Sequence, residues 1–159
     1  MADGAADGVA GTIAVVRFSD HIVVSRPAAE AFRYIADFEN TADWDPGIAG
    51  SRKLTDGPVR VGSQFDVIAV FRGKRQQFRY TVTELEDGRR IVLEGVSAKA
   101  RSVDAITVDR SGDGSRISYT ADVRLRGFRR IAEPLLQPML AKTGEHALAG
   151  LQRKLDHSG

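Results

Sequence analysis

The stretch QQFRYTVTELEDGRRIVLEGVS, residues 76–97, carries the clearest structural signal in the sequence. Apolar and polar side chains alternate in its first half, as they do in a β-strand with one buried face. Asp87-Gly88 at its centre favours a tight hairpin turn, because both residues tolerate positive φ. A second strand pattern with several apolar residues follows at residues 90–97. The stretch therefore predicts two antiparallel strands joined by a hairpin.

Further strand patterns lie on both sides of this hairpin. They cover residues 12–25, 48–55, 63–72, 102–110 and 116–125. Pro27 opens a short helix, since its missing N–H costs nothing in a first turn, and residues 37–46 predict a second short helix or a turn. Residues 128–155 predict a long helix. Consecutive hairpins form an antiparallel sheet, and this helix is the only predicted element long enough to cover it. The predicted fold class is α+β.

The long helix has apolar residues on two different sides. Leu135 and Met139 point one way, whereas the apolar residues between 140 and 155 are centred on another direction. Pro138 lies at the changeover and predicts a kink or a break, because proline lacks the N–H of the helical hydrogen bond. We expect the C-terminal half to lie on the sheet and the segment 135–140 to lift or to turn, which would leave a cavity.

The length of 159 residues is typical of one domain. Residues 1–11 are rich in Ala, Gly and Asp and predict a disordered tail, so we expect a single domain over residues 12–157. The absence of cysteine excludes disulfides and cysteine-ligated metals. The three histidines share no metal-ligand spacing. We expect neither a metal site nor a cofactor.

The net charge of +2 is small. Binding to a phosphate backbone needs a concentrated positive face, so we expect no nucleic-acid partner. No apolar run reaches the roughly 18 residues of a membrane span, and the N-terminal residues lack the pattern of a secretory signal. We expect a cytoplasmic protein without stable membrane insertion; the sequence makes no prediction of its oligomeric state.

Four short segments resemble a known family when they are taken together. IVVSRPAAEAF at residues 22–32 is followed by WDPGI at 44–48, VGSQF at 61–65 and ALAGLQR at 147–153. Their order and spacing resemble the START-like (SRPBCC) superfamily, and within it the bacterial polyketide cyclase/dehydrase-type proteins. The likeness extends from Arg17 to Leu155.

The resemblance implies a helix-grip fold. In this fold a curved antiparallel sheet of about seven strands wraps around a long C-terminal helix, with a hydrophobic ligand cavity between them. The superfamily includes lipid carriers, hormone receptors, aromatase/cyclases and cochaperone-like modules, so the fold alone does not select a function.

Three polar side chains share strand faces with apolar residues and are predicted to face the cavity: Tyr80, Asp104 and Tyr119. A carboxylate on an apolar face costs several kcal/mol unless it is paired or its pKa rises. Such a carboxyl can act as a general acid or base, and a phenol can meet a ligand carbonyl or enol. Asp104, Tyr80 and Tyr119 are the candidate catalytic residues.

Each candidate has a structural alternative. Arg79 or Arg101 can neutralise Asp104, or the carboxyl can lie in water at the sheet edge. The two tyrosines can be core residues whose hydroxyls bond to backbone or water. The alternation around Glu94 does not tell which face of its strand is inside, and we expect Glu94 in solvent.

We expect the cavity wall to be mainly apolar and aromatic. Trp44, the only tryptophan, closes one end of it either as a residue that stacks on the ligand or as a structural plug. The predicted ligand-binding residues are Trp44, Phe65, Val67, Ala69, Phe78, Tyr80, Ile106, Tyr119, Ala121, Leu135 and Met139.

A group of arginines lies just before the long helix: Arg124, Arg126, Arg129 and Arg130. Such a group can attract an anionic lipid or a cofactor tail. We interpret it as a solvated basic edge.

Two functions of different classes fit these features. The first is a binding module that holds a hydrophobic small molecule, such as a lipid, a polyketide or an isoprenoid-like compound. The alternative is a polyketide cyclase/dehydratase of the aromatase/cyclase type, which folds a poly-β-keto substrate in a shaped cavity. A protein-interaction module is a third interpretation. We favour binding of a hydrophobic ligand.

Overall fold

The computed structural model describes residues 13–127 and 133–157 of the chain. Its strands are β1 (Ile13–Val24), β2 (Ile48–Lys53), β3 (Gln64–Phe71), β4 (Lys74–Glu86), β5 (Arg90–Val96), β6 (Ala100–Ser111) and β7 (Gly114–Arg126). Its helices are α2 (Ala28–Ala36), the 3₁₀ turn η1 (Phe38–Asn40), α3 (Thr41–Trp44) and α4 (Glu133–His157).

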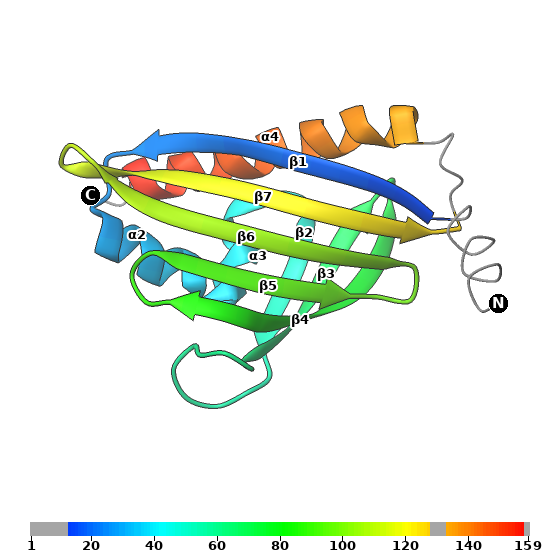
Figure 1. Ribbon diagram of the computed structural model, residues 1–159, viewed down its shortest axis with the longest axis horizontal. Coiled ribbons are helices and arrows are strands. Elements are labelled where there is room, and N and C mark those ends of the chain that lie inside the picture. The colour runs from blue at the N-terminus through cyan, green and yellow to red at the C-terminus, as the bar shows by residue number, and fades with distance from the viewer. Residues whose placement is uncertain (1–12, 128–132, 158–159) are drawn as a thin grey trace, which may run out of the picture.

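The seven strands form one antiparallel sheet in the order β1-β7-β6-β5-β4-β3-β2. Figure 1 shows the sheet curving around α4 and the short helices. The α+β fold with a curved sheet and a long C-terminal helix is therefore confirmed. The predicted tail 1–11 and the first residues of the predicted helix, 128–132, lie outside the described residues.

The core lies on the inner face of the sheet. Alternate residues of each strand point there, as period-2 geometry requires, and α2, α3 and the C-terminal half of α4 pack against them. Phe32 and Ile35 of α2, Phe65 of β3 and Leu151 of α4 are among its fully or almost fully buried side chains. A second, smaller cluster joins the beginning of β1 to Leu136 of α4.

The N-terminal half of α4 is attached to the free edge of β1. Glu133 Oε1 accepts a hydrogen bond from the backbone N–H of Val15, at 3.1 Å. Gln137 both accepts from the N–H of Arg17, at 3.1 Å, and donates to its carbonyl. These side chains satisfy backbone groups that an edge strand leaves unpaired.

The C-terminal half of α4 continues the same arrangement. Gln152 Nε2 donates to the carbonyl of Val23 at 2.9 Å, and Asp156 Oδ1 accepts from the N–H of Ser25 at 2.8 Å. Four polar side chains of one helix thus bind the edge of β1 from its beginning to just past its end.

These contacts correct the expectation for the middle of the helix. α4 continues through Pro138 as one helix, so no break occurs there. Leu136 is buried against β1, and the segment 135–140 does not lift from the sheet. The hydrogen bond that Pro138 removes is local, whereas the bonds that hold this segment come from a strand more than 100 residues away.

The turn between β3 and β4 has two central residues, Arg72 and Gly73, with φ of 54° and 77°. Positive φ at both positions defines the tight hairpin turn that glycine and asparagine favour. Arg72 is the only non-glycine residue with positive φ in the described part of the chain.

Candidate functional site

Asp104 lies in the middle of β6 and points to the inner face of the sheet. Its side chain is 4% exposed. Ser102, two residues earlier on the same face, donates a hydrogen bond to Oδ1, and Tyr119 of β7 donates one to Oδ2. Both carboxylate oxygens therefore have a hydroxyl partner.

Tyr80 of β4 lies on the other side of this group. Its hydroxyl is in hydrogen-bonding contact with Ser102. Its ring packs between Phe38 and Phe78, with ring centroids 5.1 Å and 5.9 Å away. Gly95 faces the ring across the β4–β5 pair, and a Cβ there would lie 2.5 Å from it, so glycine makes room for the tyrosine. The result is a chain of hydroxyls from Tyr80 through Ser102 to Asp104, with Tyr119 on the far oxygen.

The arginines that the sequence offers as partners of Asp104 bind elsewhere. Arg79 pairs with Asp66 at 2.9 Å, and Arg101 pairs with Glu94 at 2.8 Å on the outer face. Glu94 thus lies outside, as expected. Within the described residues, no ion pair involves Asp104. The carboxyl is held by hydroxyls alone.

Burial controls the acidity of this cluster. Loss of hydration raises the pKa of Asp104, although the two hydroxyl bonds counteract part of the rise. Burial, followed by repulsion from Asp104, raises the pKa values of Tyr80 and Tyr119 well above 10. Both phenols therefore keep their protons at physiological pH, and the protonated form of Asp104 persists to higher pH than that of an exposed carboxyl.

A second carboxyl, Asp45, belongs to the same electrostatic group. It follows Trp44 at the end of α3, and its Oδ1 accepts from the N–H of Gly47 at 2.8 Å. Burial, and to a smaller extent repulsion from Asp104, raises its pKa from 3.8 to about 6. Neither Asp45 nor Ser102 is among the site residues that the sequence predicts. Ser102 is two residues from Asp104, so the alternation of side chains along a strand already predicts that both lie on one face. Asp45 before Pro46 has the pattern of an ordinary turn, which gives no such signal.

The predicted ligand-binding residues fall into two groups that differ in how deeply their side chains are buried. Trp44, Phe65, Val67, Ile106 and Ala121 are buried in the core. Ala69, Phe78, Tyr80, Tyr119 and Met139 are half-buried. The first group packs against other core side chains, and the second retains accessible surface that a ligand can contact.

Leu135 does not belong to either group. It is 73% exposed, so the expectation that it faces the interior is wrong. The next residue, Leu136, takes the inward position because the contacts of Glu133 and Gln137 with β1 set the rotation of α4.

Trp44 fits the interpretation as a plug. Its side chain is 3% exposed, and its indole N–H has no partner among the described residues. Gly150 of α4 lies directly against it, since a Cβ there would be 1.9 Å from the Trp44 carbonyl oxygen. The helix can approach α3 this closely only with glycine at that position.

Two surface hollows have volumes of about 470 Å³ each, and neither is lined by Tyr80, Ser102, Asp104 or Tyr119. One is between α3 and the C-terminal half of α4, beside Asp45 and Arg153. The other is between the beginning of α2 and the turns that carry Arg89 and Arg110. Neither of them lies between the sheet and α4, where the sequence predicts a cavity.

A curved antiparallel sheet that grips one long helix, with hydroxyls and a carboxyl buried on its inner face, defines a helix-grip protein. The family model described as "Polyketide cyclase / dehydrase and lipid transport" matches residues 15–156. The chain belongs to this family. Comparison with curated protein sequences gives no significant match.

Solved structures with the same fold come from several bacteria. A START superfamily protein from Mycobacterium smegmatis is 18% identical, with a TM-score of 0.76 over 87% of this chain and 96% of that one. Protein TTHA0849 from Thermus thermophilus is 18% identical, with a TM-score of 0.75 over 89% and 96%. The aromatase/cyclase from Streptomyces sp. R1128 is 13% identical, with a TM-score of 0.75 over 89% and 93%. At these identities the likeness shows the fold.

Two kinds of feature are not found in the described residues. None of the helices there is long and apolar enough to cross a membrane. No group of three or more His, Cys, Asp or Glu side chains is placed to hold a metal ion in that part of the chain.

Proposed function

We propose that the protein binds a mainly apolar small molecule between the sheet and α4, with an oxygen group of that molecule at Tyr80 and Tyr119. The observation that carries the proposal is the Asp104 cluster. A buried carboxyl without a cation partner among the described residues costs folding free energy. A polar group of a ligand can form hydrogen bonds with this buried cluster. The surrounding aromatic side chains suit the apolar part of the same ligand.

The hydrogen bonds define which ligand groups fit. Tyr119 donates its only proton to Asp104, so the lone pairs of its oxygen are left to accept from a ligand hydroxyl or enol. When Asp104 is protonated, it can donate to Tyr119 instead, and the phenol proton becomes available to a ligand carbonyl. The raised pKa of Asp104 makes this second arrangement accessible at higher pH than for an exposed carboxyl. The cluster therefore suits a molecule with a carbonyl or an enol.

Fluorescence of Trp44 and native mass spectrometry test this proposal. The probes are a fatty acid, an isoprenoid alcohol, an aromatic polyketide and an oxygen-free hydrocarbon of similar size. Tyr119→Phe should weaken binding of the oxygen-containing probes by about tenfold, the value of one hydrogen bond, and leave the hydrocarbon unchanged. The matched control is Tyr34→Phe on α2, outside the cluster. Absence of binding by all four probes, or equal loss for the hydrocarbon, would contradict the proposal.

A second candidate function is cyclisation or dehydration of a poly-β-keto chain. The relay from Tyr119 to Asp104 favours it, because a phenol backed by a carboxyl can pass a proton to or from an enolising carbonyl. The described neighbour from Streptomyces is an aromatase/cyclase, which gives this candidate a precedent on the same fold. Asp104 would accept the proton from Tyr119 as the phenol takes one from the substrate.

The enzyme candidate has its own test. A poly-β-keto thioester analogue is incubated with the protein, and the aromatic product is followed by absorbance. Asp104→Asn should lower kcat by about 100-fold, in line with the loss of one acid–base group, while ligand affinity in the fluorescence assay changes much less. Turnover by Asp104→Asn at the wild-type rate would refute the role of Asp104.

A further inference from the structure

One end of the sheet concentrates positive charge. Three segments meet there: the β3–β4 hairpin, residues 70–75, the β5–β6 turn, residues 96–101, and the end of β7, residues 124–127. They contain Arg72, Lys74, Arg75, Lys99, Arg101, Arg124 and Arg126, and no Asp or Glu. We call these three segments, together with Leu135 of α4, the basic end.

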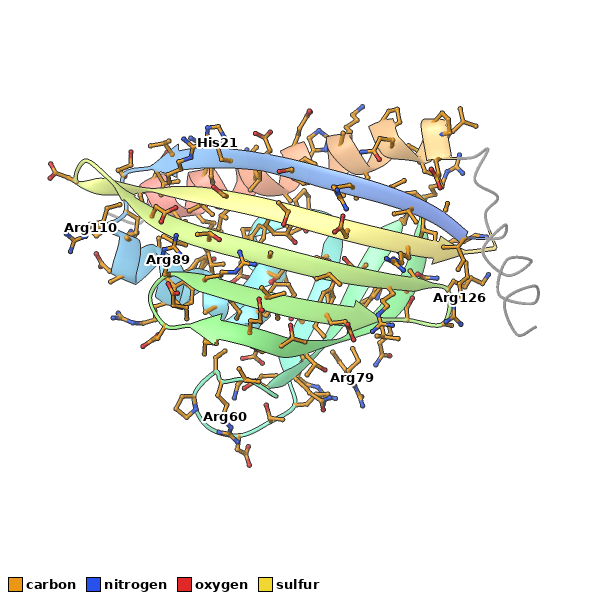
Figure 2. All side chains as sticks on the ribbon, viewed as in Figure 1. His21, Arg60, Arg79, Arg89, Arg110 and Arg126 are labelled. Atoms are coloured by element: carbon orange, nitrogen blue, oxygen red, sulfur yellow. The ribbon has the colours of Figure 1, made fainter. Side chains whose placement is uncertain are left out.

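The pairing of the strands brings these segments together. The hydroxyl of Ser97 donates to Gln76 Oε1 at 3.4 Å, which links the β5–β6 turn to the beginning of β4. The N–H of Arg126 donates to the carbonyl of Lys99 at 2.7 Å, which links the end of β7 to the same turn. Figure 1 shows β5 and β7 ending on the side where α4 begins, and Figure 2 places Arg126 there and Arg110 at the opposite end.

The positive charges of the basic end are largely uncompensated. Arg101 is paired with Glu94. The other six cations are exposed, and none of them is in an ion pair with a residue that the structure describes. Unpaired cations on one end attract an anionic partner, and the attraction weakens with salt.

Exposed apolar side chains lie among these cations. Phe71 at the hairpin is 41% exposed, Val96 at the end of β5 is 48% exposed, and Leu135 protrudes from the first turn of α4. Each comes from a different segment of the basic end. Side chains of this kind can enter the apolar layer of an interface while the cations stay at its surface.

The conformation of Arg72 is a separate observation on the same hairpin. Its φ of 54° is one that glycine or asparagine adopts at lower cost. A residue held in an unfavourable conformation at an exposed turn has a cost in folding without any packing that compensates it. A role of the Arg72 charge in binding a partner would explain why arginine occupies this position.

We propose that the basic end docks reversibly on the surface of an anionic lipid bilayer, with the apolar side chains inserted among the headgroups. Charge complementarity and the apolar tips support a bilayer as the partner. The two surface hollows described above are lined by residues outside the basic end. A bilayer needs no groove, because it accepts separate side chains at several points. This inference goes beyond the proposed ligand binding and does not depend on it.

Sedimentation with lipid vesicles tests the charge. Vesicles of phosphatidylcholine alone are compared with vesicles that also contain phosphatidylglycerol. The wild-type protein should bind only the second kind, and added salt should weaken binding. Neutralising the hairpin by Arg72→Gln, Lys74→Gln and Arg75→Gln should lower vesicle affinity by about 100-fold, roughly fivefold for each cation. The matched control neutralises exposed arginines outside the basic end, Arg33, Arg110 and Arg116, and should bind like the wild type.

Two single variants test the other observations. Phe71→Ser should lower vesicle affinity by about tenfold. Val23→Ser, at a somewhat more exposed valine near the end of β1 and away from the basic end, should leave vesicle affinity unchanged. Arg72→Gly should raise the melting temperature, because glycine suits the positive φ, and still lower vesicle affinity by about fivefold. A stabilised variant with weaker binding cannot be explained by loss of folding.

Several results would overturn the docking proposal. They are absence of binding to phosphatidylglycerol vesicles, equal loss in the matched control, and binding that the Phe71 variant leaves unchanged. Capture of an acidic protein by the basic end without any vesicle binding would assign the surface to a protein partner instead. Ligand affinity measured in solution is a separate readout, so failure of docking and failure of ligand binding are distinguishable.

Discussion

Replacement of Asp45 by asparagine should stabilise the protein at neutral pH. The pKa of Asp45 is raised from 3.8 to about 6, mainly by burial. Because the native state favours the protonated form, the stability that this group contributes is fully present below about pH 3.8 and is lost as the pH rises through about 6. Asparagine has nearly the same shape, and its Oδ1 can still accept from the N–H of Gly47.

The magnitude follows from the shift. A change of about two pKa units corresponds to about 3 kcal/mol, at roughly 1.4 kcal/mol per unit. Asp45→Asn should therefore exceed the wild type in stability by up to about 3 kcal/mol at pH 8, and the difference should vanish towards pH 3.5. For a chain of 159 residues this is about 6–12 °C in melting temperature at pH 8.

Urea denaturation followed by Trp44 fluorescence measures the effect. Trp44 is the only tryptophan and is buried, so its emission reports unfolding. The free energy of unfolding is determined from pH 4 to pH 8 for the wild type, Asp45→Asn and the control Asp43→Asn, which removes the same charge from an exposed side chain. A difference between Asp45→Asn and the wild type that does not change with pH, or a less stable variant at pH 8, would refute the reasoning.

Two further substitutions test the packing and the hydroxyl network. Gly150→Ala should destabilise the protein by about 3 kcal/mol in thermal denaturation, because its Cβ would lie 1.9 Å from the Trp44 carbonyl oxygen; Gly50→Ala, with open space around it, should cost much less. Tyr119→Phe should lower stability at pH 7 by about 1–2 kcal/mol, because Asp104 loses a hydrogen-bond donor, and it should also raise the pKa of Asp104 further. A Tyr119→Phe protein as stable as the wild type would show that the bond contributes nothing.

The strands are predictable because their signals are local. Alternation of apolar and polar residues and a turn dipeptide lie within one hairpin, and sheet pairing reinforces both. At Pro138 the sequence predicts a kink or a break, and the break does not occur because non-local contacts hold the helix. A proline in a helix is recognised from that residue alone. The N-terminal half of α4 is held by hydrogen bonds between its side chains and the backbone of β1, which is distant in the sequence.

The candidate site is predictable in part. The alternation of side chains along its strand is enough to place Asp104 on the inner face, because its neighbours on that face are apolar. Ser102 lies on the same strand face, but serine is common on both buried and exposed faces and therefore does not mark a site. Asp45 accepts a hydrogen bond from Gly47 in a local turn, and its proximity to Asp104 depends on how α3 packs against the sheet.

The attachment of α4 to β1 has a consequence for the order of folding. β1 is near the beginning of the chain, yet its partner strand β7 and the helix that covers its free edge come last. Pairs such as Ile13 with Arg126 span most of the sequence, and contacts of this kind slow folding. On the ribosome, β1 must wait with both edges unpaired until β7 and α4 have emerged. During that interval, formation of the β2–β6 meander would shorten the time for which unpaired strands are exposed to aggregation.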